Sequence, residues 1–280
     1  MNSSDVIAAN ITMHTRMADE YKTCEPHFRP ENVEKVEGIL KDIFDQTQAR
    51  RVLDLGCGTG FIIDIAKKYV EEIHGVDVTQ SMLDNVDTSG TATITLFNQD
   101  TATFDSEEGS YDVVTGYSFL HHLFDITPTL KTAVRSLKPS GIFYADLDPN
   151  FYFWHELEKL DRYAKYDPIV KREIEMVTYK DEDIEKNFGI DRDVFNQAEY
   201  GKNIQGGFRE EQLVDLLGEV GFSDTRIEYH WYIGQGQLIN DDSYSHEERF
   251  KHADVMDGML RKMLPLSRHL YKYLRIIARK

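Results

Sequence analysis

The sequence predicts an α/β fold in which helices cover both faces of a doubly wound, mostly parallel sheet. Short apolar runs typical of buried strands alternate with helical segments between residues 50 and 149. A glycine-rich turn, Gly56-Cys-Gly-Thr-Gly60, joins the first strand run to the first helical segment. Because crossovers between parallel strands are right-handed, these elements leave few possible sheet topologies.

The segment before this alternation is predicted to be helical. Apolar side chains recur at helical spacing between Val33 and Phe44. Pro30 precedes this run at a place where a helix can begin. Residues 1–48 are therefore expected to form a helical lid.

Five strand runs and the helices between them are expected to build the α/β core at residues 49–149. The strand runs cover residues 51–55, 72–76, 93–97, 112–116 and 141–145. Helices are expected at residues 61–66, near Ser81, and from His121 and Leu130 to Leu137. Such short, continuously apolar strands are typical of parallel sheets that are buried on both faces.

After Pro149 the alternation stops. Residues 150–206 are rich in aromatic and charged side chains and are predicted to form a helical cap inserted into the core. Residues 207–280 then complete the core with a helix at 210–220, ended by Gly221, and strands at 225–233 and 274–278.

A second helical insertion is expected within this last part, at residues 238–272. Met256, Met259 and Met263 recur there at helical spacing. We expect this methionine stripe to be buried against the sheet. The alternative is a soft apolar wall for a lipid-like ligand, since methionine adapts well to irregular surfaces.

The composition limits the function and location of the chain. Its 280 residues carry a net charge of −17, which opposes broad contact with nucleic acid phosphates. No apolar stretch is long enough to span a bilayer, and the N-terminus lacks the features of a secretory signal. Two cysteines cannot form a disulfide framework, so a cytoplasmic location is expected.

The chemistry of the glycine turn favours a ligand with a positive charge. Its spacing is G-x-G-x-G, which differs from the G-x-G-x-x-G of dinucleotide sites. Phe61 stands where a phosphate-binding loop needs lysine. The turn contains no basic residue for a pyrophosphate and is preceded by Asp54, which suits an ammonium or sulfonium group.

Two further acids follow the next two strands. Asp77 ends the second strand and can accept hydrogen bonds from both hydroxyls of a ribose. Asp100 ends the third strand and can accept a hydrogen bond from an adenine amino group. Because ligands bind at the carboxyl ends of parallel strands, three acids at one edge indicate a nucleoside site.

The run Val52-Leu-Asp-Leu-Gly-Cys-Gly-Thr-Gly60 resembles the first signature of class I methyltransferases, which use S-adenosylmethionine. Further motifs follow in the order of that family: Val76-Asp77, Ser81-Met-Leu83, Asp100, Asp112-Val-Val, Leu120-His-His-Leu123 and Leu137-Lys-Pro-Ser-Gly141. The resemblance is strongest to quinone-biosynthesis and other small-molecule methyltransferases. It implies a Rossmann-like, seven-stranded sheet with an antiparallel last strand.

The resemblance also implies a set of cofactor-binding residues. They are Asp54, Gly56, Gly58, Gly60, Asp77, Val78, Met82, Asp100, Thr101 and Tyr117. In this interpretation the three glycines hold the methionine part of S-adenosylmethionine, Asp77 binds the ribose, and Met82 packs on the adenine ring. Asp100 and Thr101 would read the adenine amino group, and Tyr117 would lie near the methionine amino end.

Three residues are predicted to act in catalysis. His121 and His122 follow the fourth strand and could serve as the general base, although packing between helix and sheet is the alternative role. Tyr21 resembles the lid tyrosine of related enzymes. No metal site is predicted, because the acid that catechol-type methyltransferases carry after the fourth strand is missing. Asp146, Asp148 and Asn150 are the side chains that could otherwise bind a metal there.

The predicted activity is methyl transfer to a small molecule, apolar or aromatic, by in-line displacement. Two alternatives remain open at this point: a non-methylating enzyme that binds S-adenosylmethionine on the same fold, and an inactive module that binds protein partners. The sequence leaves homodimerisation open.

Overall fold

The computed structural model describes all residues except 162, 178 and 179. Within the described residues, seven strands form one sheet in the order β3-β2-β1-β4-β5-β7-β6. They are β1 (Arg51–Leu55), β2 (Glu72–Asp77), β3 (Thr93–Asn98), β4 (Tyr111–Tyr117), β5 (Leu137–Pro149), β6 (Asp224–Tyr232) and β7 (Tyr271–Arg279). Strands β1 to β5 run parallel, whereas β7 pairs antiparallel with both β5 and β6, which confirms the predicted sheet.

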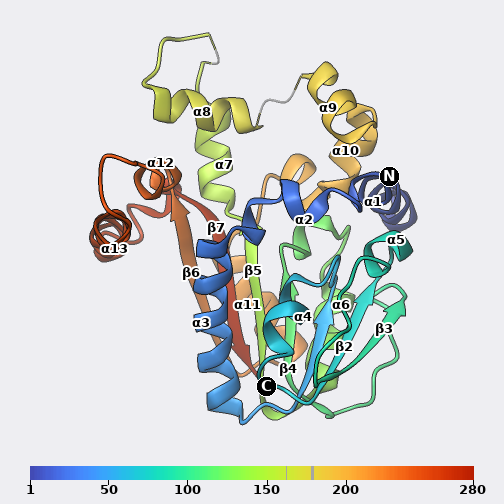
Figure 1. Ribbon diagram of the computed structural model, residues 1–280. Coiled ribbons are helices and arrows are strands. Elements are labelled where there is room, and N and C mark those ends of the chain that lie inside the picture. The colour runs from blue at the N-terminus through green and yellow to red at the C-terminus, as the bar shows by residue number, and fades with distance from the viewer. Residues whose placement is uncertain (162, 178–179) are drawn as a thin grey trace.

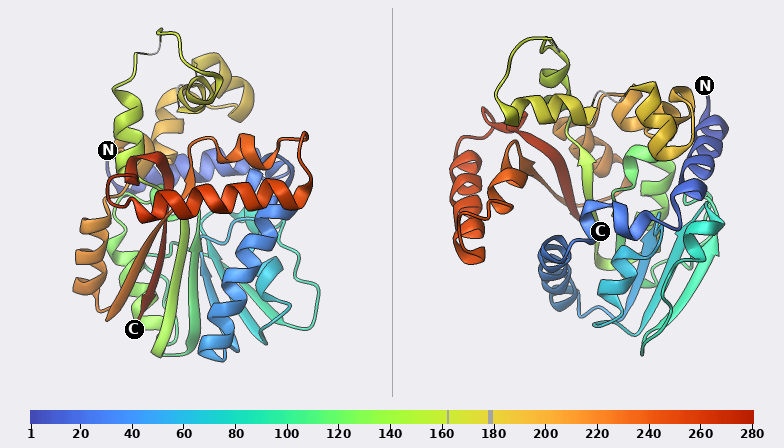
Figure 2. Two further views of the ribbon diagram at one scale, coloured as in Figure 1. Left: turned by 90° about the vertical axis from the view of Figure 1, so that its left-hand side faces the viewer. Right: turned by 45° about the horizontal axis from the view of Figure 1, so that its top comes forward.

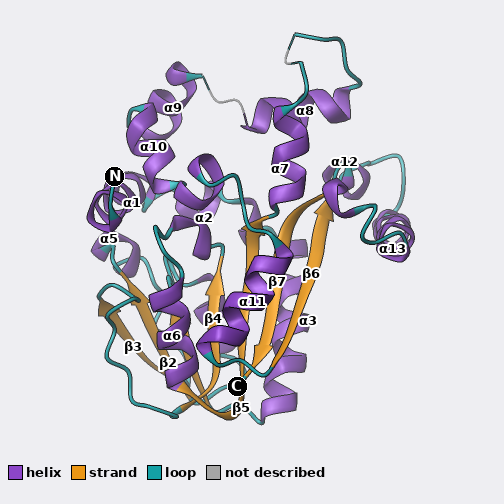
Figure 3. Ribbon diagram, turned by 180° about the vertical axis from the view of Figure 1, so that it is seen from behind, coloured by secondary structure: helices purple, strands orange, loops and turns teal. Residues whose placement is uncertain are grey.

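Helices cover both faces of the sheet, as the doubly wound prediction requires (Figure 1). On one face α3 (Pro30–Thr47) and α4 (Phe61–Ala66) bury apolar side chains such as Leu40 and Ile63. The opposite face is covered by α6 (Thr127–Ser136) and α11 (Glu210–Val220), seen from behind in Figure 3. Burying both faces leaves the carboxyl ends of the parallel strands as the natural ligand edge.

The helices above this edge come from two distant parts of the chain. The N-terminal part forms α1 (Ser3–Met17), α2 (Tyr21–Cys24) and the 3₁₀ turn η1 (Pro26–Phe28). The part between β5 and α11 forms α7 (Phe151–Glu158), α8 (Pro168–Val177), α9 (Asp181–Phe188), α10 (Arg192–Ala198) and the π-helical turn η3 (Tyr200–Ile204). Met13 of α1 packs with Phe195 of α10 in one apolar cluster, so both parts roof the same edge.

Short elements complete the chain. After β2 comes α5 (Gln80–Leu83), and after β4 comes the 3₁₀ turn η2 (Leu120–His122). Between β6 and β7 lie α12 (Gln235–Ile239), α13 (His246–Lys262) and the 3₁₀ turn η4 (Arg268–Leu270). No helix among the described residues combines the length and apolarity that crossing a bilayer requires.

The methionine stripe does not lie where the sequence predicted it. Met256, Met259 and Met263 are 45%, 57% and 48% exposed, so the prediction that they are buried against the sheet is wrong. Helix α13 runs across the outside of the molecule (Figure 2) and buries Ala253 and Leu260 instead. The helical spacing was correct, but the helix is rotated so that a different stripe faces the sheet.

Candidate active site

A pocket with about 860 Å³ of empty space opens at the carboxyl ends of β1, β2 and β4. Eleven of the predicted site residues line it: Tyr21, Asp54, Gly56, Gly58, Asp77, Val78, Met82, Asp100, Thr101, Tyr117 and His122. The structure places Gly60 and His121 outside this lining.

The glycine turn brings bare backbone to the pocket wall. Gly56 has φ +69°, and a Cβ there would meet the ring of Phe119 at 2.0 Å. Gly58 has φ +52° and donates its N–H to Oδ2 of Asp77 at 2.9 Å. Both residues adopt the left-handed backbone that favours glycine. Gly60 instead caps the start of α4 with φ +90°, a conformational role away from the pocket.

Asp54 at the end of β1 is 1% exposed and only partly hydrogen-bonded. Its Oδ1 accepts a hydrogen bond from the hydroxyl of Thr115 at 2.6 Å. Its buried Oδ2 has no hydrogen-bond partner in the part of the chain that the structure describes. Burial raises the pKa of Asp54 to about 7. The pocket therefore contains a carboxylate whose second oxygen can receive a positively charged donor.

Asp77 is held by the backbone on both sides. Its Oδ1 accepts the N–H of Thr79 at 2.8 Å, while Oδ2 accepts the N–H of Gly58. Burial raises the pKa of this carboxyl, and the two backbone N–H groups oppose that rise. Each oxygen keeps a further lone pair, so a fixed Asp77 can still accept hydrogen bonds from a ligand.

The third acid and its neighbour lie on the far side of the pocket. Asp100 accepts the backbone N–H of Ala102 at 2.9 Å. The hydroxyl of Thr101 is buried and shares a hydrogen bond of 2.9 Å with Thr129. Thr101 therefore reaches the pocket with its hydroxyl already paired. Met82 is 2% exposed and supplies an apolar surface beside Gly58.

Aromatic rings form the wall between the lid and the sheet. Tyr117 lies 4.6 Å from Phe61, and Phe61 lies 4.9 Å from His27, as measured between ring centroids. His27 in turn contacts Tyr21 of the lid at 5.9 Å. Burial raises the pKa of Tyr21 and of Tyr117, so both phenols keep their protons near neutral pH.

Sequence reasoning missed several residues of this wall. His14, His27, Phe28, Phe61 and Phe119 also line the pocket. Two of them carried a local signal, because Phe61 directly follows the glycine turn and Phe119 directly precedes the histidine pair. The other three come from the N-terminal segment, and their place depends on how that segment folds over the sheet.

The two predicted histidines differ in their surroundings. His122 lines the pocket and directs Nδ1 to the carbonyl oxygen of Ala198 at 2.7 Å. His121 points its Nδ1 to Oδ1 of Asp148 at 2.9 Å and lies outside the pocket. Burial lowers the pKa of His121 to about 4 and lowers that of His122 well below its usual range. Both imidazoles are therefore neutral at physiological pH.

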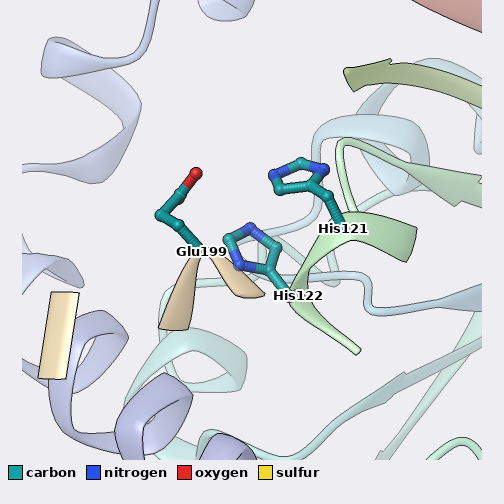
Figure 4. A group of neighbouring side chains, drawn as sticks. All are labelled: His121, His122 and Glu199. Atoms are coloured by element: carbon teal, nitrogen blue, oxygen red, sulfur yellow. The ribbon is translucent and has the colours of Figure 1, made fainter. Parts of the chain in front are cut away.

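A glutamate that sequence reasoning missed faces this pair. Glu199 lies between α10 and η3, and its Oε2 accepts a hydrogen bond from Lys202 at 3.3 Å. Burial opposes ionisation of Glu199, but Lys202 and the neighbouring histidines outweigh it and hold the pKa below its usual range. Figure 4 shows Glu199 beside His121 and His122.

The candidate metal ligands at the end of β5 contact other side chains and main-chain groups. Asp146 accepts hydrogen bonds from Arg275 and Tyr144, both at 2.7 Å, and contacts His230. Asp148 accepts from the backbone N–H of His121 at 3.0 Å as well as from its ring. Asn150 donates to two main-chain carbonyls near η4. These side chains hold β5, β7 and η2 together.

Comparison with known proteins agrees with this geometry. Residues 53–145 match a family described as a methyltransferase domain. A ubiquinone biosynthesis O-methyltransferase of Idiomarina loihiensis is 29% identical over 129 residues, which cover 42% of this chain and 50% of that protein. The enzyme of the same name from Aliivibrio fischeri MJ11 is 27% identical over 154 residues, covering 52% and 65%. The chain thus spans about half to two thirds of these curated relatives.

Solved structures agree on the fold. A SAM-dependent methyltransferase from Archaeoglobus fulgidus superposes with a TM-score of 0.51 at 20% identity, over 89% of this chain and 94% of that one. A phosphoethanolamine N-methyltransferase of Haemonchus contortus gives a TM-score of 0.56 at 15% identity, over 100% and 60%. Residues 53–145 therefore match a methyltransferase domain, and the whole chain has the fold of S-adenosylmethionine-dependent methyltransferases.

Proposed function

We propose that the protein transfers a methyl group from S-adenosylmethionine to a small-molecule acceptor. The observation that carries this proposal is the buried Oδ2 of Asp54 inside the pocket, which has no partner among the described residues. An ionised carboxylate in that position is costly unless a positive group pairs with it. S-adenosylmethionine carries both an ammonium and a sulfonium, and its product S-adenosylhomocysteine keeps the ammonium.

The remaining lining fits the other parts of the cofactor. Gly56 and Gly58 present bare backbone at the pocket, where the methionine chain can lie against it, and the ring of Phe119 packs directly on Gly56. Asp77 can accept hydrogen bonds from ribose hydroxyls, with Val78 beside it. Met82 offers an apolar face for adenine, and Asp100 lies where it can accept from the adenine amino group. When bound, the cofactor supplies a methyl group on a positively charged sulfur.

The acceptor is proposed to lie under the roof formed by the N-terminal helices and the cap. His14, Tyr21, His27 and Phe28 line that side of the pocket together with His122. Such a wall suits an aromatic or apolar acceptor that carries a hydroxyl group. The enclosed site can exclude water and align the acceptor for in-line displacement, an effect worth up to about 7–11 kcal/mol.

The residues around the acceptor can manage its proton. The Nδ1 of His122 faces a carbonyl oxygen and must donate to it, so Nε2 carries a lone pair that can accept a proton. Tyr21 keeps its own proton and can donate a hydrogen bond to the acceptor. We therefore assign proton acceptance to His122, positioning to Tyr21, and a supporting role to His121, which does not line the pocket.

A cytoplasmic location is also proposed. Cys24 and Cys57 are both free thiols. Reducing compartments maintain cysteines in this form. Fractionation of cells that express the protein should recover it with cytoplasmic markers, and recovery with an exported fraction would contradict the proposal.

Calorimetric titration with S-adenosylmethionine and S-adenosylhomocysteine tests the proposed cofactor. We expect both ligands to bind the wild type, and Asp77→Ala to lose most of that affinity. Asp84→Ala is the matched control, because Asp84 is exposed on the same loop region and does not line the pocket. Absence of binding to folded protein, stripped of any copurified ligand, would contradict the proposal. Formation of S-adenosylhomocysteine with a panel of hydroxylated aromatic compounds would then identify the acceptor class.

A further inference from the structure

Three metal-binding side chains meet at the edge of the pocket. His121 and His122 come from η2 after β4, and Glu199 comes from the junction of α10 and η3. One potential ligand atom from each lies within 4.8 Å of the others. The cap brings Glu199 to the histidine pair, so this cluster exists only when the inserted helices fold back onto the sheet (Figures 1 and 4).

Both imidazole rings are fixed in the orientation that metal-binding histidines use. His122 donates Nδ1–H to the carbonyl oxygen of Ala198 at 2.7 Å. His121 directs Nδ1 to Oδ1 of Asp148 at 2.9 Å, and that oxygen already accepts the backbone N–H of His121. In both rings Nδ1 faces an oxygen that accepts hydrogen bonds. The lone pair of each ring is therefore on Nε2. Metal-binding histidines are typically held in this way by a carboxylate or a carbonyl behind the ring.

The free nitrogens face Glu199. Figure 4 shows each ring directing one nitrogen toward the space beside the Glu199 carboxylate. Among the described residues no hydrogen bond joins Glu199 to either ring, although all three side chains are close enough to bind one ion. Lys202 contacts Oε2 of Glu199, and the carboxylate has a second oxygen, Oε1, for a ligand bond.

We propose that His121, His122 and Glu199 bind a divalent transition metal ion of the zinc class. Two neutral imidazoles and one carboxylate are a ligand set that suits Zn²⁺ and its neighbours Co²⁺ and Fe²⁺. Three protein ligands leave an open coordination position, as in catalytic zinc sites. The proposed ligands differ from Asp146, Asp148 and Asn150, at which the sequence analysis predicts no metal site.

The location gives the ion a chemical role. His122 lines the pocket, so the open position of an ion bound there would face the acceptor side. A bound Zn²⁺ lowers the pKa of a coordinated hydroxyl group and holds its oxygen in place. With the ion present, His122 is a ligand and no longer the proton acceptor. This role rests on the proposed methyl transfer, whereas the metal site itself does not.

Metal binding can be measured without any acceptor. The full-length protein is stripped with a chelator, dialysed and titrated with Zn²⁺ in competition with a chromophoric chelator. We expect one equivalent to bind the wild type and His252→Gln, since His252 is an exposed histidine on α13 away from the cluster. Glu199→Gln and His122→Gln should bind at least about 100-fold more weakly, because changes behind a ligand already cost 10–100-fold.

Two further measurements keep the test decisive. X-ray absorption of the Zn²⁺-loaded wild type should show two imidazole ligands. This measurement uses the wild type alone, so it does not depend on whether a variant folds. Binding of S-adenosylhomocysteine by each variant reports whether the pocket is intact. The metal site is overturned if the wild type binds no Zn²⁺, if its spectrum lacks imidazole, or if folded variants bind equally well. Zn²⁺ binding without any binding of S-adenosylhomocysteine would instead contradict the methyltransferase proposal and leave the metal site standing.

Discussion

Two buried aspartates at the same edge of the sheet have opposite surroundings. Asp54 ends β1 and Asp146 lies near the end of β5, and each is 1% exposed. Within the described part of the chain, Asp54 keeps one oxygen without a partner, whereas both oxygens of Asp146 accept hydrogen bonds. Burial raises the pKa of Asp54 to about 7. Burial acts on Asp146 as well, but His230 and Arg275 outweigh it and hold its pKa far below the usual range.

This difference shows that a buried charge indicates a ligand site only when its partners are counted. Arg275 pairs with Asp146 at 2.7 Å and with Glu228 at 3.1 Å, so these three charges of β5, β6 and β7 compensate one another. The half around the glycine turn leaves Asp54 for a molecule from outside. We infer that one half contributes chiefly to stability and the other to binding.

The largest expected effect is on stability, from Asp146→Asn. The substitution removes the carboxylate that pairs with Arg275, which is 6% exposed. Breaking a buried ion pair in this way costs about 3–5 kcal/mol, because the remaining charge stays buried without compensation. Urea unfolding at neutral pH should show this loss, while Asp54→Asn should not lower the free energy of unfolding, because it removes a buried carboxyl group whose ionised form is costly in the fold. Equal destabilisation by both variants would refute the division between the two halves.

The second effect is on cofactor affinity, from Asp54→Asn. The amide cannot offer a charged acceptor to the ammonium of the cofactor. Hydrogen bonds to charged groups are worth about 1.5–3 kcal/mol, which corresponds to roughly 10- to 150-fold weaker binding. Calorimetry with S-adenosylhomocysteine measures the change. A variant that binds as tightly as the wild type would show that Asp54 does not meet the ligand.

The strands and helices of the sheet domain were predicted well from the sequence. The strand at 51–55 and the helix at 210–220 match β1 and α11 in both bounds, because local patterns and Gly221 determine them. Eleven of thirteen predicted site residues line the pocket, and ten of them share one reason: they lie at or after the ends of strands whose order the motifs determine. The exception is Tyr21 in α2. Their roles toward the cofactor and acceptor remain proposals.

The roof over the pocket was much less predictable. Glu199 and His27 reach the site only through packing of the cap and the N-terminal helices, and no local pattern marks them. The exposed Met259 shows the same limit, since helical spacing cannot tell which side of a helix faces the sheet. The pairing of Asp146 with Arg275 likewise joins residues far apart in the sequence.

The smallest expected effect is a pH dependence of cofactor binding. With the pKa of Asp54 at about 7 in the empty pocket, this carboxyl is mostly protonated at pH 6 and mostly ionised at pH 8. The ammonium group of the ligand pairs with the ionised form. The affinity for S-adenosylhomocysteine should therefore rise between pH 6 and 8, approaching about tenfold per pH unit on the acid side. Calorimetry in buffers of different ionisation enthalpy should also detect a proton released on binding.

The same raised pKa has the opposite consequence for the unliganded fold. Between its ordinary value of 3.8 and about 7, Asp54 binds a proton in the folded state but has lost it in the unfolded chain. This group's contribution to stability is therefore present at low pH and is lost as the pH rises to about 7. In Asp54→Asn the pH dependence of binding should flatten. The free energy of unfolding should also lose the part of its pH dependence that comes from the titration of Asp54. A wild-type binding profile that is already flat would show that another group carries the charge of the site.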